Sequence, residues 1–342
     1  MKFVTVFRRL GATALILCIA CGNTSKQTVS RATTADRHSE KTAIMDQKNI
    51  NDQPENYSMR WYESKNPDEN KGVALGEARD VPLAETRAVA LVIHGLNLRP
   101  SRMEPIINIL TDSGIDALNL SLRGHGPNYD RHAHSDPARA RLDAFKSVSY
   151  QLWMDEVCSA YSTAKRRSDK RGVPLFLIGY SLGGLVGADL LATDPGVHFD
   201  KMVLFAPAVK MHLRNYLIRA LSPFPRLTIP SFALASYQSN DGTPMAGYNA
   251  LFESLNSFAR NAGPKANVPT LVFIDQKDEI VSYSRLKQMV QDKNLYQWEF
   301  YIVQKENTEG PAKIHHLIID APSTGENVWK IMMQAMVDHL QD

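Results

Sequence analysis

The pentapeptide Gly179-Tyr180-Ser181-Leu182-Gly183 joins an apolar run to a helix-like segment, and this junction strongly restricts how the chain can fold. The run before it, "VPLFLI", has the composition of a buried strand, and "LGGLVGADLLATD" follows with helical composition. A strand that passes directly into a helix needs a sharp turn, so the residues two places from the serine must lack bulk. The sequence therefore predicts a strained strand–turn–helix unit that holds the Ser181 hydroxyl clear of a sheet.

A hydroxyl presented in this way is suited to nucleophilic attack. The helix that begins after Ser181 supplies free N–H groups and a positive dipole end, both of which stabilise a developing oxyanion. A serine hydroxyl remains a poor nucleophile unless a histidine, oriented by a carboxylate, takes its proton. In strand–G-x-S-x-G–helix units the acid and the histidine follow the serine in that order.

Candidates for both groups occur downstream. The stretch "TLVFIDQKDEIVS" ends a predicted strand with Asp275 and Asp278, and "AKIHHLIID" provides His315 and His316 after the next strand. Residue type and order alone leave two candidates for each role.

Apolar strands alternate with helical segments along most of the remaining chain, and this pattern predicts an α/β fold with a mostly parallel central sheet and helices on both faces. Residues 208–267 interrupt the alternation with helical pieces around a Pro-rich turn, "SPFPRLTIP". Because a plain connection is usually about 2–6 residues long, we interpret this region as an inserted helical lid. The predicted strands are 88–95, 115–121, 173–181, 201–209, 268–275 and 296–303.

The N-terminus has the pattern of an export signal. A basic start is followed by an apolar stretch, Leu10 to Ala20, that is too short to span a bilayer comfortably. The small residue Ala20 before Cys21 resembles the lipobox of bacterial lipoproteins, which implies a signal peptide over 1–20 and lipidation of Cys21. A simple signal peptide or an uncleaved anchor is the alternative. Residues 21–56 are polar and form a predicted flexible tether to a folded domain at 57–342.

The folded part resembles the α/β-hydrolase superfamily, and within it the monoacylglycerol lipase, lysophospholipase and serine-aminopeptidase-like branch. The resemblance covers about Tyr57 to Leu340. The motifs that carry it are His94-Gly95, "LRGHG" (Leu122 to Gly126), "GYSLGG", "APA" (Ala206 to Ala208), Asp278 before Ile280-Val281, and His315 followed by Leu317 and Asp320.

This resemblance implies a catalytic set of Ser181, Asp278 and His315, with His316 and Asp275 as the second choices. It also implies that backbone N–H groups of Leu96 and Leu182 form the oxyanion hole.

The chain departs from the family pattern in two places. Asp275 stands where the family has glycine, and Ser121 stands where the family has aspartate. The loop "YDRHAHSD" (129–136) carries two histidines and two carboxylates, but such spacing on a loop is commonly incidental, and we predict neither a metal site nor a cofactor.

The predicted function is a membrane-tethered serine ester hydrolase that acts on acyl lipids such as monoacylglycerol or lysophospholipid. A proline-iminopeptidase-like serine peptidase is the alternative within the same chemistry, and a non-catalytic binding lipoprotein is the alternative from another class. Lys and Arg are interspersed with Asp and Glu at a net charge of +3, so no nucleic-acid partner is expected. The N-terminus predicts a bacterial cell-envelope location, with Gly22 after the cysteine favouring the outer membrane. The sequence sets no oligomeric state.

Overall fold

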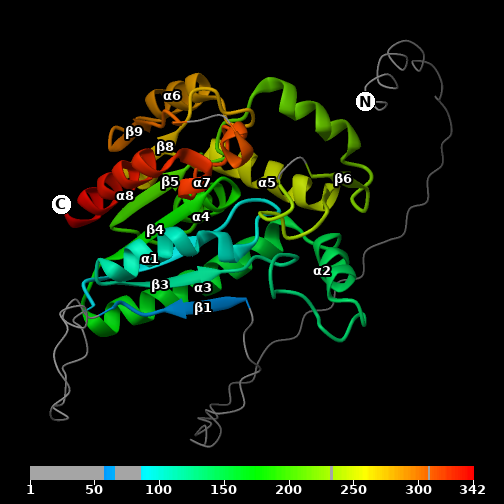
Figure 1. The fold of residues 1–342 in the computed structure, drawn as a ribbon, viewed down its shortest axis with the longest axis horizontal. Coiled ribbons are helices and arrows are strands. Elements are labelled where there is room, and N and C mark those ends of the chain that lie inside the picture. Colours follow the sequence, from blue (N-terminus) through cyan, green and yellow to red (C-terminus); the bar gives the residue numbers. More distant parts are fainter. Residues whose placement is uncertain (1–57, 66–85, 232–233, 307–308) are drawn as a thin grey trace, which may run out of the picture. The chain divides into compact units, whose positions relative to one another are not determined.

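A seven-stranded sheet crosses the part of the chain that the computed structural model describes, residues 58–65, 86–231, 234–306 and 309–342 (Figure 1). The strand order is β1-β3-β2-β4-β5-β8-β9. The signal peptide, Cys21 and the tether fall outside the described residues.

Six neighbouring strands of this sheet are parallel, and only β1 runs antiparallel, against β3. The mostly parallel sheet predicted from the sequence is confirmed. The strands are β1 (Met59–Tyr62), β2 (Ala88–Ile93), β3 (Ile115–Leu120), β4 (Leu175–Tyr180), β5 (Lys201–Phe205), β8 (Thr270–Ile274) and β9 (Trp298–Ile302).

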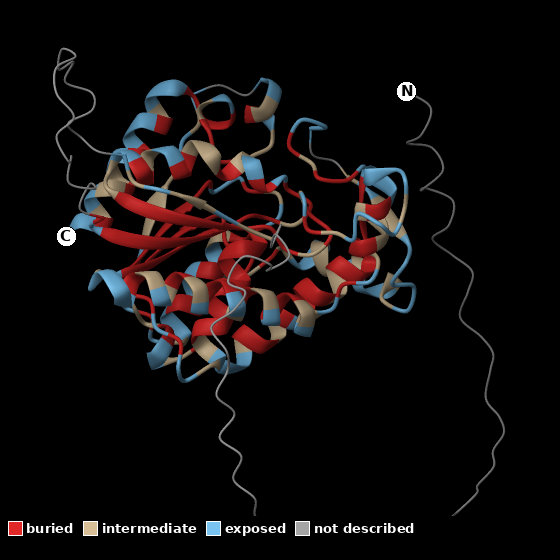
Figure 2. Ribbon diagram, turned by 90° about the horizontal axis from the view of Figure 1, so that it is seen from below, coloured by how far each residue is buried: buried red, intermediate tan, exposed pale blue. Residues whose placement is uncertain are grey.

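Both faces of the central strands are buried, which is why these strands are apolar without a polar alternation. In β2, Val89, Leu91 and Ile93 belong to one hydrophobic cluster, whereas Ala88, Ala90 and Val92 belong to a second cluster on the other face. Figure 2 shows the buried strands as a layer between helices.

The two clusters are covered by different helices. The first contains side chains of α3 (Tyr150–Arg171), α4 (Leu182–Thr193), α5 (Met245–Asn261) and α6 (Tyr283–Asp292). The second contains side chains of α1 (Glu104–Asp112) and α8 (Glu326–Gln341). Local signals set the ends of α3: the Ser149 side chain accepts a hydrogen bond from the Leu152 N–H, and Gly172 ends the helix with a left-handed φ of 66°.

The predicted lid divides into two parts with different packing. The first part contains the 3-10 helix η2 (Leu213–Leu221), in which no residue is buried, and the short antiparallel pair β6 (Thr228–Pro230) and β7 (Gly242–Pro244). The second part is α5, whose Leu251, Leu255 and Phe258 are buried in the first cluster. The predicted boundary is therefore too wide, because α5 buries an apolar face against α4 and α3 and belongs to the core. We refer to residues 212–244 as the cap.

The remaining short elements connect this framework: η1 (Pro100–Met103), α2 (Pro137–Phe145), η3 (Pro264–Ala266), η4 (Gly310–Lys313) and α7 (Ala321–Thr324). No helix among the described residues is both long and apolar enough to cross a membrane.

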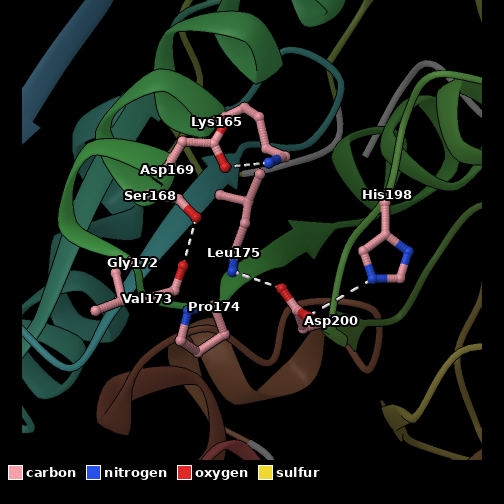
Figure 3. A pocket seen from close by; sticks show the side chains of 9 residues that line it. All are labelled: Lys165, Ser168, Asp169, Gly172, Val173, Pro174, Leu175, His198 and Asp200. Carbon is pink, nitrogen blue, oxygen red and sulfur yellow. Dashed lines mark hydrogen bonds and ion pairs between the residues drawn. The ribbon is translucent and has the colours of Figure 1, made fainter.

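A pocket of about 400 Å³ lies where β4 begins, near Leu175, and extends to Asp200 just before β5 (Figure 3). Ser181 follows the last residue of β4, so this pocket and the serine lie at opposite ends of that strand. The polar groups that line the pocket bond to one another: Lys165 with Asp169, Ser168 with the Val173 carbonyl, and Asp200 with the Leu175 N–H. The pocket therefore forms no part of the candidate active site.

Candidate active site

Ser181 occupies the turn between β4 and α4 that the sequence predicted. Its φ of 51° lies in a region that non-glycine residues rarely adopt, at a cost of about 1–3 kcal/mol. The Ser181 N–H donates to the Phe205 carbonyl at 2.9 Å, and the Ser181 carbonyl accepts from the Ala208 N–H at 3.0 Å. Both sides of the strained residue are thus held by the end of β5 and the residues that follow it.

The glycines beside the serine are required by close backbone contacts. A Cβ added at Gly183 would lie 2.1 Å from the Ile93 carbonyl oxygen, and one at Gly179 would lie 2.5 Å from the Gly184 Cα. Any larger side chain would push α4 away from the ends of β2 and β4. This confirms the steric argument made from the sequence.

His316 is the histidine that contacts the serine. The Ser181 hydroxyl donates to His316 Nε2 at 2.8 Å, and His316 Nδ1–H donates to Asp278 Oδ2 at 2.8 Å. The prediction of His315 is therefore wrong, although the prediction of Asp278 agrees with this geometry. Both histidines lie in a turn closed by a hydrogen bond from the Leu317 N–H to the Ile314 carbonyl, and the direction of that turn aims His316 at the serine.

The second pair of candidates forms a separate contact. His315 Nδ1–H donates to Asp275 Oδ2 at 2.7 Å. The structure thus contains two adjacent Asp–His pairs, and Ser181 bonds to the pair that includes Asp278. The other oxygen of Asp278 accepts the N–H groups of Ile280 and Val281 at 2.7 and 2.8 Å, so this carboxylate cannot rotate without breaking three hydrogen bonds.

Two buried histidines shape the loop after β2. The Leu122 N–H donates to His94 Nε2 at 3.1 Å, so His94 Nδ1 carries the proton and donates to the Gly95 carbonyl at 2.8 Å. In the same way, the Asn97 N–H donates to His125 Nε2 at 2.9 Å. Burial lowers the pKa of His94 to about 4 and lowers the pKa of His125 as well, so both rings stay neutral.

This loop passes directly beside the serine. A Cβ added at Gly95 would lie 3.3 Å from Ser181 Cβ and 2.7 Å from the Tyr180 ring, so Leu96 directly follows a residue that packs against the serine turn. Leu182 is the first residue of α4, and the first N–H groups of a helix have no partner within it. This placement is consistent with the predicted oxyanion roles of Leu96 and Leu182, which remain predictions.

Several residues around the histidine turn were not identified from the sequence. The Glu279 carboxylate accepts the N–H groups of His315 and His316, and the Lys305 ammonium donates to the carbonyls of Ile314 and Leu317. The only signal in the sequence was the position of Glu279 directly after the acid. Nothing in the sequence marked Lys305.

The acidic and histidine-rich loop at 129–136 forms no metal site. Among the residues that the structure describes, no group of three or more His, Cys, Asp or Glu side chains could hold a metal ion.

Sequence comparison places the chain among known hydrolases. The family described as "Serine aminopeptidase, S33" matches residues 84–250, which contain β2, the turn at Ser181 and the whole cap. The chain is similar to this family over 167 of its 342 residues. It is 23% identical to human monoglyceride lipase over 266 residues, which cover 69% of this chain and 82% of that protein. The mouse monoglyceride lipase is 24% identical over 263 residues.

Solved structures show the same α/β-hydrolase fold. A soluble variant of monoglyceride lipase from Saccharomyces cerevisiae, in complex with a substrate analogue, superposes with a TM-score of 0.63 at 13% identity and covers 83% of this chain and 90% of that one. The monoacylglycerol lipase of Paleococcus ferrophilus gives 0.55 at 16% identity, with 82% and 99% covered. With a serine, a histidine and an aspartate in one hydrogen-bonded series, the α/β-hydrolase chain is a serine ester hydrolase.

Proposed function

We propose that this protein is a membrane-tethered hydrolase of acyl lipids of the monoacylglycerol or lysophospholipid type. The observation that carries the proposal is the hydrogen-bonded series Ser181–His316–Asp278, which has the connectivity needed for an acyl-enzyme mechanism.

In the first half of the reaction, Ser181 Oγ attacks the acyl carbonyl while its proton passes to His316 Nε2. Asp278 keeps the proton of His316 on Nδ1 and stabilises the imidazolium that forms. The oxyanion accepts hydrogen bonds from the N–H groups of Leu96 and Leu182. The imidazolium then protonates the departing alcohol, and the acyl group stays on Ser181.

In the second half, water takes the place of the alcohol. His316 Nε2 accepts a proton from the water, whose oxygen attacks the acyl carbon, and the same N–H groups stabilise the second oxyanion. The bond to Ser181 Oγ breaks as His316 returns the proton to the serine. The fatty acid leaves, and the residues return to their starting protonation states.

The surface of the cap favours a lipid substrate. Leu213, Leu217 and Phe224 are 72%, 78% and 62% exposed, and they lie on one short stretch of the chain. Residues 202–240 contain no Asp or Glu, while the arginines of the cap, Arg214, Arg219 and Arg226, are exposed. An apolar surface with basic neighbours is typical of segments that contact anionic lipid surfaces.

The location of the enzyme is also a proposal. Diacylglyceryl and N-acyl chains on Cys21 would bury enough methylenes to anchor the protein stably, at about 0.8 kcal/mol each. The tether that follows would let the cap reach the lipid surface. We propose a bacterial envelope location, with the outer membrane favoured by Gly22 after the cysteine.

The catalytic proposal is tested on Ser181→Ala. We expect wild-type protein to react with a fluorophosphonate probe at Ser181 and to hydrolyse soluble p-nitrophenyl esters, and we expect the variant to lose both properties while keeping its circular dichroism spectrum and Tm. Ester hydrolysis that persists undiminished in Ser181→Ala would rule out the assignment. A wild-type protein without labelling or turnover would favour the non-catalytic alternative.

The lipid proposal is tested by a substrate panel and by cap variants. We expect Leu217→Ser with Phe224→Ser to lower turnover of emulsified long-chain monoacylglycerol about tenfold and to leave a short soluble ester unchanged. Equal losses on both substrates would mean that the cap has no specific role with lipid substrates. Exposed Ile331, on α8, provides a matched surface control as Ile331→Ser.

A serine peptidase remains the second candidate because the matching family is described as an aminopeptidase. Recognition of a substrate amine needs an acid near the serine. The acidic residues of the region 208–267, Asp241 and Glu253, are both exposed. Turnover of aminoacyl amides in preference to acyl esters in the same panel would favour this candidate.

The anchor is tested separately with a clickable fatty acid in cells. Wild-type protein should incorporate the label, and Cys21→Ala should lose it and accumulate as uncleaved precursor. Equal labelling of the two proteins would favour the alternatives for the N-terminus, a plain signal peptide or an uncleaved anchor.

A further inference from the structure

The turn that carries the catalytic histidine contains two adjacent histidines, and each has an aspartate partner. His316 Nδ1 lies 2.8 Å from Asp278, and His315 Nδ1 lies 2.7 Å from Asp275. A small rotation of this turn would move His316 Nε2 away from Ser181 Oγ, which now lies 2.8 Å from it. Some part of the structure must therefore hold the backbone of the turn.

Glu279 holds one side of the turn through two N–H groups. Its Oε1 accepts the His315 N–H at 3.0 Å, and its Oε2 accepts the His316 N–H at 3.0 Å. Each carboxylate oxygen thus has one backbone donor, and hydrogen bonds to a charged acceptor are stronger than neutral ones. Because Glu279 directly follows Asp278, the segment that supplies the catalytic acid also supplies this anchor.

Side chains of the cap hold the backbone of Glu279. The Glu279 carbonyl accepts hydrogen bonds from the side chains of Arg214 and Asn215 at 3.2 and 3.1 Å. The His212 ring also donates to the Asp278 carbonyl at 2.9 Å. Residues of the cap therefore also hold the acid segment.

Lys305 holds the carbonyl side of the turn. Its ammonium donates to the Ile314 and Leu317 carbonyls, both at 2.7 Å, and these two residues flank the histidines. Lys305 is half-buried, and desolvation lowers its pKa to about 8, against the opposing effect of Asp275, Glu279, Asp278 and Asp320 nearby. A half-buried lysine with two carbonyl partners is well suited to fixing backbone geometry.

We propose that Glu279 and Lys305 are positioning residues that clamp the turn Ile314–Leu317 from both sides and thereby select His316 over His315 as the base for Ser181. This inference rests on the proposed function for its kinetic readout. The clamp itself touches neither the serine nor the substrate. It acts through the position of the His316 ring.

The test compares graded variants with matched controls on a soluble ester. Glu279→Ala removes both acceptors, Glu279→Gln leaves one, and Lys305→Met removes both donors. The controls are Asp292→Ala and Lys277→Met, which remove exposed side chains of the same charge. Active-site titration with a fluorophosphonate and measurement of Tm give the folded fraction, so that kcat refers to folded protein only.

We expect Glu279→Ala and Lys305→Met to lower kcat about 10- to 100-fold, since a displacement of about 1 Å costs that much, with KM changed less than about threefold. Glu279→Gln should fall between wild type and Glu279→Ala, and both controls should keep wild-type kcat.

A second measurement does not depend on activity. The proton of His316 Nδ1 shared with Asp278 gives a low-field NMR resonance, and we expect Glu279→Ala to shift or broaden it while Asp292→Ala leaves it unchanged. A Glu279→Ala protein with wild-type kcat, or with an unchanged resonance, would overturn the clamp. A wild-type protein that shows the resonance but hydrolyses no ester would instead refute the proposed function. The effect of Glu279→Ala on the resonance would still show whether Glu279 positions His316.

Discussion

The two Asp–His pairs of this site have the same chemistry and different surroundings. Asp278–His316 and Asp275–His315 have nearly equal Nδ1 to Oδ2 distances, 2.8 and 2.7 Å. The side chains of the first pair are 0% and 7% exposed, and those of the second are 7% and 21% exposed. The first pair has Ser181 beyond its histidine, and two backbone N–H groups hold its aspartate. An Asp–His contact alone therefore does not identify a catalytic base.

The difference between the pairs comes from the backbone and not from the side chains. Asp275 Oδ1 accepts one backbone N–H, from Lys277, whereas Asp278 Oδ1 accepts two. Consecutive residues in a turn point in different directions, so only one of two adjacent histidines can face the serine. Which histidine can act as the base for Ser181 therefore depends on the position of the turn that carries both of them.

The largest expected effect separates the two histidines. His316→Ala should lower kcat on a soluble ester by about 10⁵- to 10⁶-fold, because the serine loses its base. His315→Ala should stay within about fivefold of wild type. Steady-state kinetics on both purified variants provide the measurement. A greater loss in His315→Ala would reverse the assignment of the pairs.

The next effect separates the two acids. Asp278→Asn should lower kcat on the order of 10⁴-fold, because the amide favours the wrong tautomer of His316. Asp275→Asn should lower it less than about threefold. Steady-state kinetics of both purified variants on the same soluble ester provide the measurement. Similar losses in both variants would mean that the two pairs act together.

A third prediction concerns His94, a buried histidine whose ring bonds to backbone groups and not to a carboxylate. The pKa of His94 is lowered to about 4 by burial, below the ordinary value of about 6.5, so the unfolded chain binds the proton more readily than the folded protein does. Stability is therefore fully present above about pH 6.5 and falls as the pH drops toward 4. Between pH 7 and pH 5 this group alone should cost about 2 kcal/mol of unfolding free energy.

Urea denaturation at the two pH values measures this loss in wild type and in His94→Gln. The variant should be less stable at pH 7 but should lose less stability on acidification. An equal pH dependence in the two proteins would show that His94 is not the group that titrates.

The smallest expected effect concerns Asp189, which is a buried carboxylate like Asp278. Asp189 Oδ2 accepts from Tyr150 and Ser254, and its Oδ1 has no partner among the described residues. Burial raises the pKa of Asp189, so its ionisation costs stability above that pKa, and the loss is regained as the pH falls through it. Asp189→Asn should therefore raise the unfolding free energy by about 1 kcal/mol at alkaline pH, with a smaller gain in acid. A destabilised variant at every pH would contradict this.

Much of the molecule was predictable because local rules decide it. The buried strands, the sharp turn at Ser181 and the small residues around it follow from short-range sterics and apolar patterning, which act within a few residues. The order of serine, acid and histidine follows from the same turn context. Residue type and order left Asp275 and Asp278 open, and the family resemblance, through the acid before Ile280-Val281, chose Asp278.

Long-range packing decided the rest. The sequence could not show that α5 belongs to the core, because its apolar face has the same spacing whether it covers a ligand or packs on α4. It could not separate His316 from His315, because the choice depends on Glu279 and Lys305, which lie 37 residues before His316 and 12 residues before Leu317. Hydrogen bonds between segments so far apart in the chain leave no periodic pattern in the sequence, and only the folded arrangement brings them together.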